Sequence, residues 1–414
     1  MVNDKVKYIT YSHGLTTDVF NKILKKTSSP PSYAPINYSN SINKGLICNI
    51  FNKNLEVIIV PTFGVFPITK ILFFKPKKFF IKRIKFSYVF IINLFIIKQL
   101  LITVELFIKT FTWAIKNILR RKIIIVQGIN TPFLLSASIS KFIFKSKIIL
   151  FLPDLPDFMY SYSKEKSILK SNFYKLDILI LNYLINKADF FVPINSYIKD
   201  SFLKGKHSFV INGFINNDCF VKKESFNKIN GKKYVMYAGA LFEKYGVKQL
   251  IDAFRLIDRD DIIFWIFGSG DLQEYVIDVA SKDDRIIYFG NVDNDVVLSY
   301  ELEADLLVNP RFSTDEYTKF SFPSKILEYM HSGTPVLTTK LDCFGKEYDD
   351  HLYFFKDETL SGFSEDINYI LSKKSSELID FGKAAKEFVL KNNNPDIQIK
   401  MLLQVYHNCI NNHN

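Results

Sequence analysis

Residues 320–339 read FSFPSKILEYMHSGTPVLTT and join a bounded helix to an apolar strand. Pro323 suits the first position of a helix, Gly333 suits a left-handed stop, and Pro335 cannot continue the helix. These signals predict a helix over 323–332, followed by the apolar run TPVLTTKL. A helix that leads directly into an apolar strand is the repeating unit of α/β proteins.

Similar apolar runs recur along the chain. In the first half they are KVKYITYS, LEVIIVPT, KIIIVQGI, KIILFLPD, ADFFVPIN and HSFVINGF. In the second half they are KYVMYAGAL, DIIFWIFGSG, RIIYFGNV, ADLLVNPR and TPVLTTKL. Short apolar runs of this kind suit parallel strands covered on both faces, and the intervals, such as VKQLIDAFRLI, are long enough for crossover helices. The pattern predicts an α/β protein with two doubly wound domains in tandem.

Chain length and one polar interval set the domain boundaries. With 414 residues, 48% of them hydrophobic, the chain can bury two cores, since one domain takes about 100–200 residues. The stretch NNDCFVKKESFNKINGKK has no apolar periodicity and is interpreted as a linker at 215–232. We therefore predict domains over 1–214 and 233–395, with a last helix in 396–414.

Net charge and cysteine content indicate the kind of partner and the cellular compartment of the protein. A net charge of +12 predicts an acidic partner, which can be nucleic acid, an anionic membrane face or a phosphorylated substrate. No apolar segment with a cleavage site opens the chain, so we expect a reduced, cytoplasmic location. The cysteines show neither pairing nor metal spacing; they are Cys48, Cys219, Cys343 and Cys409.

A basic aromatic segment favours the membrane. Residues 57–104 contain no acid, and KILFFKPKKFFIKRIKF, at 70–86, interleaves cations with phenylalanines. No nucleic-acid-binding motif accompanies it, whereas phenylalanines beside lysines suit the acyl boundary of an anionic bilayer. We expect this patch to hold the protein at the inner face of the plasma membrane, without nucleic acid as a partner. The alternative is that the phenylalanines are core and the lysines merely solvated.

The apolar run after this patch is too short to span a bilayer. It extends from Phe86 to Ile97, and Lys98 interrupts it well short of the ~20 residues that a spanning helix needs. On a helix, one narrow arc would hold Ser87, Lys98, Glu105, Lys109 and Lys116. This arrangement predicts a long helix packed in the first domain, with a thin solvated stripe.

The helix predicted at 323–332 separates two faces. Ile326, Tyr329 and Met330 form a buried arc, and the opposite arc holds Ser324, Lys325 and Glu328. A lysine in the first turn is unfavourable unless an anion shares the site, and the free amides of a helix start bind phosphate. Glu328 could accept hydrogen bonds from a ribose diol. The alternative is an ordinary surface pair of Lys325 and Glu328.

These motifs, taken in order, resemble a known family. The helix, with YAGALFEKYGVKQLIDAF, FGSGD, FGNV and ADLLVNPR, is similar to the donor-binding domain of glycosyltransferase family 4. A looser resemblance over the first domain rests on ITYSHGLTTDVFNKIL, FLPDLPDFM and VINGF. The family consists of retaining enzymes with two Rossmann-like domains facing a cleft, the GT-B fold. The chain most resembles bacterial members that build surface polysaccharides, and the resemblance implies that the last helix crosses back to the first domain.

The resemblance assigns donor contacts position by position. Glu328 matches the second glutamate of the E-x7-E motif, which binds the donor ribose, and Lys244 matches the lysine on the diphosphate. Backbone near the donor is assigned to Gly239, Gly268, Gly290 and Val292.

Two positions depart from the family pattern. Ala240 stands where the family has an arginine of the phosphate clamp, and Lys325 is placed to replace it. Phe320 stands at the first glutamate of the motif. Substitutes in the same loop are Arg311, Asp315 and Glu316, of which Arg311 is predicted as a donor contact and Glu316 as a catalytic carboxylate.

The first domain supplies acceptor-side candidates. Asp154 and Asp157 follow an apolar strand, where ligands of open α/β sheets bind, and either could orient or deprotonate the acceptor hydroxyl. The loop with His13 and Gly14 follows the first strand and faces the same cleft in this topology. Ordinary turn chemistry is the alternative for the two aspartates, and a plain loop histidine is the alternative for His13.

We therefore predict a retaining glycosyltransferase that takes a nucleotide sugar and a glycan or polyprenyl-linked acceptor. No metal or other cofactor is expected, because the string DND at Asp293–Asp295 is better explained as a helix start than as a metal-binding Asp-x-Asp. Two alternatives are open: a nucleotide-sugar epimerase on the same architecture, or a non-catalytic donor-binding subunit.

Overall fold

The computed structural model describes the chain except for residues 1–5, 29–32, 51, 160–167, 216–227 and 412–414. It divides into two compact units. The first contains Met1–Ile194, Ile198–Asn212 and Pro395–Asn414, and the second contains Asn195–Tyr197 and Gly213–Asn394. The boundary lies beside the one we set at 214, and most of the predicted linker lies outside the described residues.

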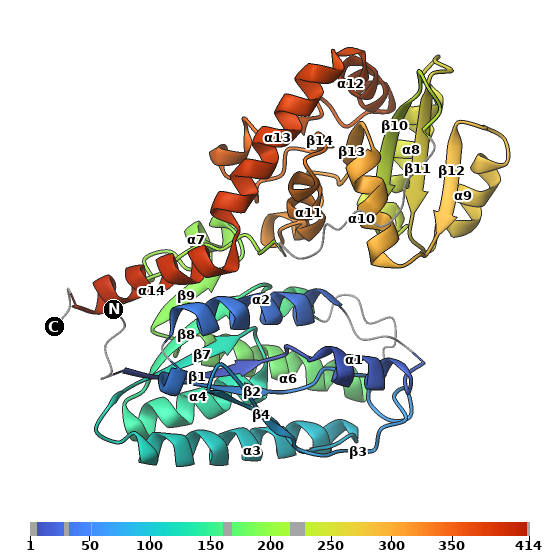
Figure 1. Cartoon of the computed structure of the whole chain (residues 1–414). Coiled ribbons are helices and arrows are strands. Elements are labelled where there is room, and N and C mark those ends of the chain that lie inside the picture. The colour runs from blue at the N-terminus through green and yellow to red at the C-terminus, as the bar shows by residue number, and fades with distance from the viewer. Residues whose placement is uncertain (1–5, 29–32, 51, 160–167, 216–227, 412–414) are drawn as a thin grey trace. The chain divides into compact units, whose positions relative to one another are not determined.

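The first unit is built on a seven-stranded sheet (Figure 1). In spatial order its strands are β4 (Lys78–Ile81), β5 (Ile84–Tyr88), β2 (Leu55–Ile59), β1 (Val6–Ser12), β7 (Arg121–Gln127), β8 (Lys147–Leu152) and β9 (Phe190–Pro193). All pairs are parallel except β4 with β5. Five of the six predicted runs form strands here, because their uninterrupted apolar side chains are buried on both faces.

The sixth run, HSFVINGF, does not form a strand, so this prediction was wrong. It follows the edge strand β9 irregularly: the Phe209 N–H donates to the Phe191 carbonyl (3.0 Å) and the Ile211 N–H to the Pro193 carbonyl (3.1 Å). One isolated bridge, between Phe191 and Ser208, is formed. The segment thus follows the edge strand β9 without forming a regular ladder.

Helices cover both faces of this sheet. On one face α2 (Tyr33–Asn49) packs against α14 (Pro395–Asn411), and Asn49 donates to the Asp396 carbonyl (2.8 Å). On the other face α3 (Phe95–Lys116), α4 (Thr131–Phe144) and α6 (Ile168–Ile185) lie side by side (Figure 1). The remaining elements are α1 (Thr17–Leu24), η1 (Asn52–Asn54), β3 (Phe73–Phe74), β6 (Ile91–Ile92), α5 (Pro156–Met159) and α7 (Ser196–Asp200).

Most of the polar arc expected on the long helix turns inward, which corrects our prediction of a solvated stripe, and only Lys116 at its end is exposed. Ser87 is not helical but buried in β5, and α3 begins at Phe95. Lys98 is buried and donates to the Phe63 carbonyl (2.8 Å), and burial lowers its pKa to about 8. Glu105 accepts from the Phe90 N–H. These side chains satisfy backbone groups of the loops before the helix, so they face protein.

The basic aromatic segment forms a hairpin at the sheet edge. Lys82 and Arg83 connect β4 to β5 with positive φ values of 46° and 65°. Phe74 and Phe86 are buried, whereas Phe73 and Phe80 are exposed. The cations are exposed except for the half-buried Lys85, and their numbers are Lys70, Lys75, Lys77, Lys78, Lys82, Arg83 and Lys85. The phenylalanines are therefore divided between core and surface.

The second unit has a six-stranded parallel sheet. Its order is β12 (Ile286–Gly290), β11 (Ile262–Phe267), β10 (Lys233–Ala238), β13 (Leu306–Asn309), β14 (Val336–Thr338) and β15 (Tyr353–Phe354). All five predicted runs form strands in it. Its helices are α8 (Val247–Arg255), α9 (Gln273–Ala280), α10 (Asn294–Glu303), α11 (Ser324–Ser332), α12 (Leu360–Ser372) and α13 (Ser375–Asn392). Short turns are η2 (Glu243–Tyr245), η3 (Glu316–Phe320) and η4 (Lys346–Tyr348).

Both units have the doubly wound α/β architecture that the sequence predicted. In the parts of the chain that the structure describes, no helix combines the length and the apolar sequence needed to cross a bilayer.

Candidate functional site

Three loops meet at the carboxyl ends of the second sheet. The Gly239 N–H donates to the Phe267 carbonyl (3.1 Å), and the Gly268 N–H donates to the Gly290 carbonyl (2.8 Å). Gly268 has a φ of 123°, and a Cβ there would overlap the Gly239 carbonyl. The loops approach this closely because Gly268 has no side chain. The structure thus brings the three predicted glycines together, at the edge where doubly wound sheets bind ligands.

Helix α11 is fixed to this edge by a tyrosine. The Tyr329 hydroxyl donates to the Ala238 carbonyl (3.1 Å) and accepts from the Ala238 N–H (2.8 Å), one residue before Gly239. The predicted helix is confirmed: it runs from Ser324 to Ser332 and ends at Gly333, which has a φ of 85°. The predicted buried arc is also confirmed, since Ile326, Tyr329 and Met330 are all buried.

A lysine and two glutamates form a cluster beside α11. Lys325 and Glu328 are in direct contact, as the shared arc predicted. The Lys325 ammonium also lies 3.5 Å from a carboxylate oxygen of Glu301, on α10, which is 0% exposed. Among the described residues, neither carboxylate oxygen of Glu301 has a hydrogen-bond partner.

The cluster keeps Lys325 charged. Burial lowers the pKa of Lys325, but the charges of Glu328 and Glu301 raise it by more, so the net shift is upward. Burial, together with the charge of Glu328, raises the pKa of Glu301. Sequence reasoning missed Glu301, because α10 has no periodic apolar face that distinguishes Glu301 from the neighbouring Glu303.

Two further cations flank one aromatic ring in the loop after β10. The Lys244 ammonium lies 5.0 Å from the ring centre of Tyr245, and the Arg311 guanidinium lies 5.1 Å from it. The Tyr317 hydroxyl donates to the Lys244 carbonyl (3.2 Å), which joins η3 to the same loop. The structure therefore gathers Lys244 and Arg311, and places the exposed Glu316 at the start of the adjoining η3.

The remaining donor-side candidates lie at element ends. Ser324 is exposed at the start of α11, and half-buried Val292 stands between β12 and α10. Asp293 is the N-cap of α10, so the prediction that DND opens a helix is confirmed. Among the described residues no three acidic, histidine or cysteine side chains are grouped as metal ligands. The expectation of metal independence stays a prediction.

The acceptor-side loop of the first unit is tightly fixed. The His13 Nδ1–H donates to the Val60 carbonyl (3.0 Å), and its ring stacks on Phe133 with centres 4.8 Å apart. Burial, aided by the charge of Lys98, lowers the pKa of His13 against the effect of this hydrogen bond. The Gly14 N–H donates to the Ser12 hydroxyl (3.0 Å). The imidazole is consequently held neutral, with Nε2 as its acceptor.

The two predicted aspartates follow β8 at the same end of the sheet. Asp157 is exposed in the short helix α5. Asp154 keeps exposed surface, yet the protein around its carboxyl group withdraws solvent and raises its pKa to about 6. A carboxyl with a pKa near neutrality suits proton transfer.

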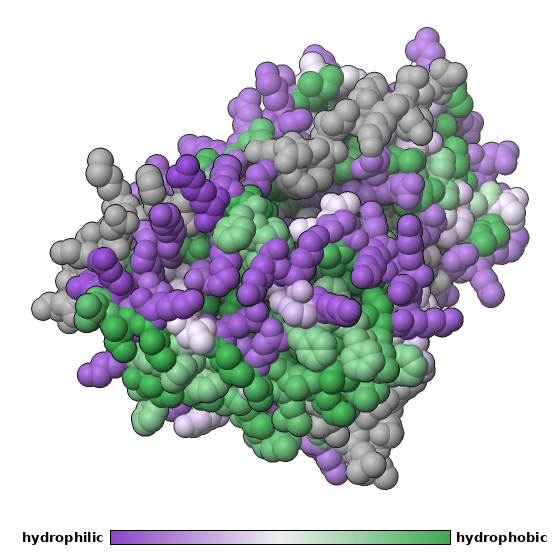
Figure 2. Space-filling view, turned by 60° about the horizontal axis from the view of Figure 1, so that its bottom comes forward, coloured by the Kyte–Doolittle hydropathy of each residue, from purple (hydrophilic) through white to green (hydrophobic). Residues whose placement is uncertain are grey.

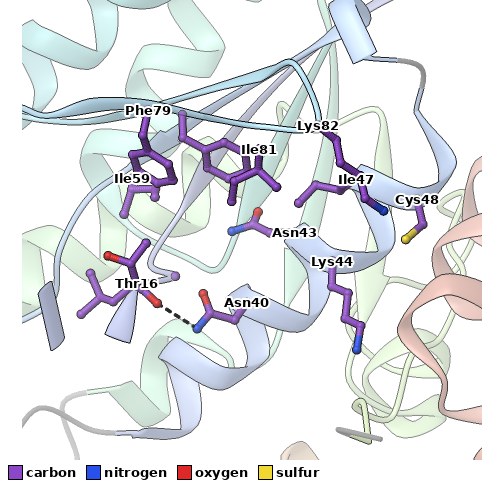
Figure 3. Close-up of a pocket in the computed structure, with 13 residues that line it drawn as sticks. Thr16, Asn40, Asn43, Lys44, Ile47, Cys48, Ile59, Phe79, Ile81 and Lys82 are labelled. Atoms are coloured by element: carbon purple, nitrogen blue, oxygen red, sulfur yellow. Dashed lines mark hydrogen bonds between the residues drawn. The ribbon is translucent and has the colours of Figure 1, made fainter. Parts of the chain in front are cut away.

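A cavity of about 370 Å³ lies between α2 and the β4–β5 hairpin, beside Gly14 (Figure 3). Its walls are mainly apolar and include Leu15, Ile47, Ile59, Phe79, Ile81 and Phe86. The Asn40 amide, which donates to the Leu15 carbonyl (3.2 Å), is one of its polar groups, and the others come from Thr16, Asn43, Lys44 and Lys82. Sequence reasoning assigned the hairpin to the membrane surface and did not connect it with the loop that contains Gly14.

Comparisons with known proteins agree with this architecture. Residues 220–388 match the family model described as glycosyl transferases group 1. Sucrose-phosphate synthase from Thermosynechococcus elongatus is similar, with a TM-score of 0.66, 13% identity, and coverage of 98% of this chain and 99% of that one. Anabaena HepE, solved with UDP, has a TM-score of 0.60 at 13% identity, covering 98% of this chain and 100% of that one.

A third solved structure is the lipopolysaccharide outer core galactosyltransferase WaaB, with a TM-score of 0.60, 14% identity, and coverage of 97% of this chain and 99% of that one. Among curated protein sequences there is no significant match. The second unit therefore matches the glycosyl transferases group 1 family over residues 220–388, and the chain as a whole has the GT-B fold.

Proposed function

We propose that the chain is a retaining glycosyltransferase that moves a hexosyl residue from a nucleotide sugar to a glycan or lipid-linked glycan. The observation that carries this proposal is the polar cluster at the carboxyl ends of the second sheet. Amides of the glycine loops and of the α11 start, together with Lys244 and Lys325, suit a diphosphate. Glu328 suits the ribose diol.

In the proposed reaction, the bond between the anomeric carbon and the diphosphate breaks as the acceptor oxygen bonds to the same face of the sugar. The acceptor proton passes to the departing diphosphate or to Asp154. Lys244, Lys325 and the helix amides stabilise the charge that develops on the leaving group. Arg311 and Glu316 contact the sugar in place of the absent first glutamate. This scheme requires no metal.

We propose uridine as the base of the donor. The similar protein HepE was solved with UDP, with UDP and glucose, and with UDP-glucose. HepE and this chain are 13–14% identical in sequence, and UDP is therefore the first probe to use.

For the acceptor, we propose a polyprenyl-linked glycan in surface-polysaccharide synthesis, used at the inner face of the plasma membrane. The cavity beside Gly14 supports this choice, since its apolar walls with Lys82 at the edge suit an amphipathic molecule that carries phosphate. The exposed cations of the hairpin also suit an anionic surface.

The test incubates the purified full chain with labelled UDP-hexoses, with and without a bacterial lipid extract. We expect label in the lipid fraction only when both are present, and an α-linked product from an α-linked donor. Conversion of the donor sugar without lipid would instead identify an epimerase. Tight UDP binding with neither reaction would identify a donor-binding subunit, and a β-linked product would contradict retention.

A further inference from the structure

The outward face of α3 is mainly apolar. Exposed aliphatic residues recur three or four positions apart at Ile97, Leu100, Val104 and Ile108, and Ile115 follows two turns later. The most exposed of them is Leu100, with 62% of its surface accessible to solvent. This spacing places all five side chains on one side of the helix.

Two charged residues of α3 turn toward the protein, whereas Gln99, Thr112 and Lys116 are exposed. Lys98 is buried against Phe63, and Glu105 binds the backbone of Phe90 and pairs with Lys109 at 3.2 Å. A surface helix of a water-soluble protein has the opposite arrangement, with its apolar stripe toward the core. Helix α3 therefore has the polarity of a helix whose outer surroundings are apolar.

Two neighbouring helices extend the same surface. In α4, Phe142 is 89% exposed and Ile143 lies beside it. In α6, Leu179 is 68% exposed, and Leu176 and Tyr183 are exposed one turn before and after it. We call the exposed apolar side chains of α3, α4 and α6 the apolar face. Figure 2 shows hydrophobic side chains gathered in a broad area over the lower part of the view, with few hydrophilic ones between them.

The charges around the apolar face are almost all positive. Residues 57–153 contain sixteen lysines and arginines but a single acid, Glu105. Exposed cations at the edges of the three helices are Lys116, Arg120, Lys145 and Lys175. The acids of these helices, Glu105 and Asp177, are both engaged, the second by the Thr131 hydroxyl at 2.6 Å. A partner for this surface must accept apolar side chains at its centre and carry negative charge at its rim.

We propose that the apolar face docks on an anionic phospholipid bilayer, with its aliphatic and aromatic side chains at the acyl boundary and its cations among the headgroups. A bilayer meets both requirements, and scattered single exposed residues would not call for one. This inference is independent of the proposed function, because a chain without transferase activity could dock in the same way. It also places the main apolar attachment on these helices, with the β4–β5 hairpin as an additional cationic contact.

The test is co-sedimentation of the full chain with vesicles of phosphatidylglycerol and phosphatidylcholine, or of phosphatidylcholine alone. The variant carries Leu100→Gln, Val104→Gln and Ile108→Gln, since glutamine preserves helix propensity and adds no charge. The matched control carries Leu256→Gln, Ile277→Gln and Ile379→Gln, three exposed aliphatic positions of the second unit. Circular dichroism and thermal melting verify that both fold.

We expect the wild type and the control to bind mixed vesicles equally, with salt-sensitive affinity, and phosphatidylcholine vesicles more weakly. The face variant should need about tenfold more lipid or more for half-binding, because three apolar side chains no longer leave water. In a Val104→Trp variant, the fluorescence of the new tryptophan should be quenched by lipids that are brominated on their acyl chains.

Three results would overturn the proposal. The first is vesicle binding of the face variant as tight as that of the wild type. The second is absence of quenching at position 104 while the protein is bound. The third is a wild-type dimer in solution that the face variant converts to a monomer, which would assign the apolar face to a second copy of this chain.

Discussion

The ammonium group of Lys325 lies 3.5 Å from the carboxylate of Glu301, a side chain with 0% exposure, while it also contacts Glu328. One cation thus lies beside two carboxyl groups. When Glu328 turns to a donor ribose, as we propose, Glu301 remains as the counter-ion of Lys325. Glu301 is therefore a positioning residue that keeps the Lys325 ammonium in the first turn of α11.

The first prediction concerns Glu301→Gln. We expect the Kd for UDP to rise about tenfold, because glutamine cannot take up the negative charge that holds the Lys325 ammonium once Glu328 turns to the ribose. The thermal stability should be unchanged or higher, since Lys325 keeps Glu328 and a buried carboxylate is removed. Calorimetric titration and thermal melting measure the two effects separately.

The pH dependence of that stability has a defined sign. Burial raises the pKa of Glu301, so its ionisation opposes folding as pH rises above the ordinary value for glutamate. The stability advantage of Glu301→Gln should therefore be smallest in acid and grow toward neutral pH. The control is Glu303→Gln on the same helix, which pairs with Lys228 at 3.8 Å and should leave UDP affinity unchanged. Equal UDP affinity in both variants would contradict the positioning role.

The second prediction concerns the residues expected on the nucleotide itself. Lys325→Ala and Glu328→Ala should each weaken the donor complex by roughly 1.5–3 kcal/mol, the value of one charge-assisted contact. Lys282→Ala removes a lysine from an exposed pair with Asp278 (2.7 Å) and serves as the control. The assigned site is wrong if both α11 variants bind UDP and turn over donor like the control.

The third prediction concerns the proton on the acceptor side. Because burial raises the pKa of Asp154 to about 6, we expect kcat/KM to rise as pH increases through that value and Asp154 ionises. Asp154→Asn should remove this limb of the pH profile, whereas Asp157→Asn should preserve it. If kcat/KM of Asp154→Asn still rises near the same pH, the titrating group is a residue other than Asp154.

The fourth prediction concerns metal. Saturating chelator should leave activity within about twofold of the untreated enzyme, because lysines and helix amides stabilise the leaving diphosphate in our scheme. Activity is measured with the chain first dialysed against chelator and then supplied with magnesium or manganese. A tenfold loss of activity that magnesium or manganese restores would show that the reaction requires a metal ion.

The sequence was sufficient where structure follows from local chemistry. Helix α11 begins one residue after Pro323, which is its N-cap, and ends at Gly333, because proline and glycine act on the backbone at or next to their own positions. Ten apolar runs formed the predicted strands, since a continuous apolar run is stable only when both of its faces are covered. The contact of Lys325 with Glu328 followed from helical spacing alone. The roles assigned to these side chains stay predictions.

Tertiary structure determined the features that depend on which segment packs against a given face of a helix or strand. The pattern of α3 located an arc with Lys98 and Glu105, but only the loops at Phe63 and Phe90 turned that arc inward. Glu301 became a buried counter-ion because α10 packs on α11, more than twenty residues further along the chain. HSFVINGF is as apolar as the runs that form strands, yet it contacts β9 through only one isolated bridge and a few backbone hydrogen bonds. A segment's own residues set its local conformation, whereas burial and charge pairing are set by the residues that fold against it.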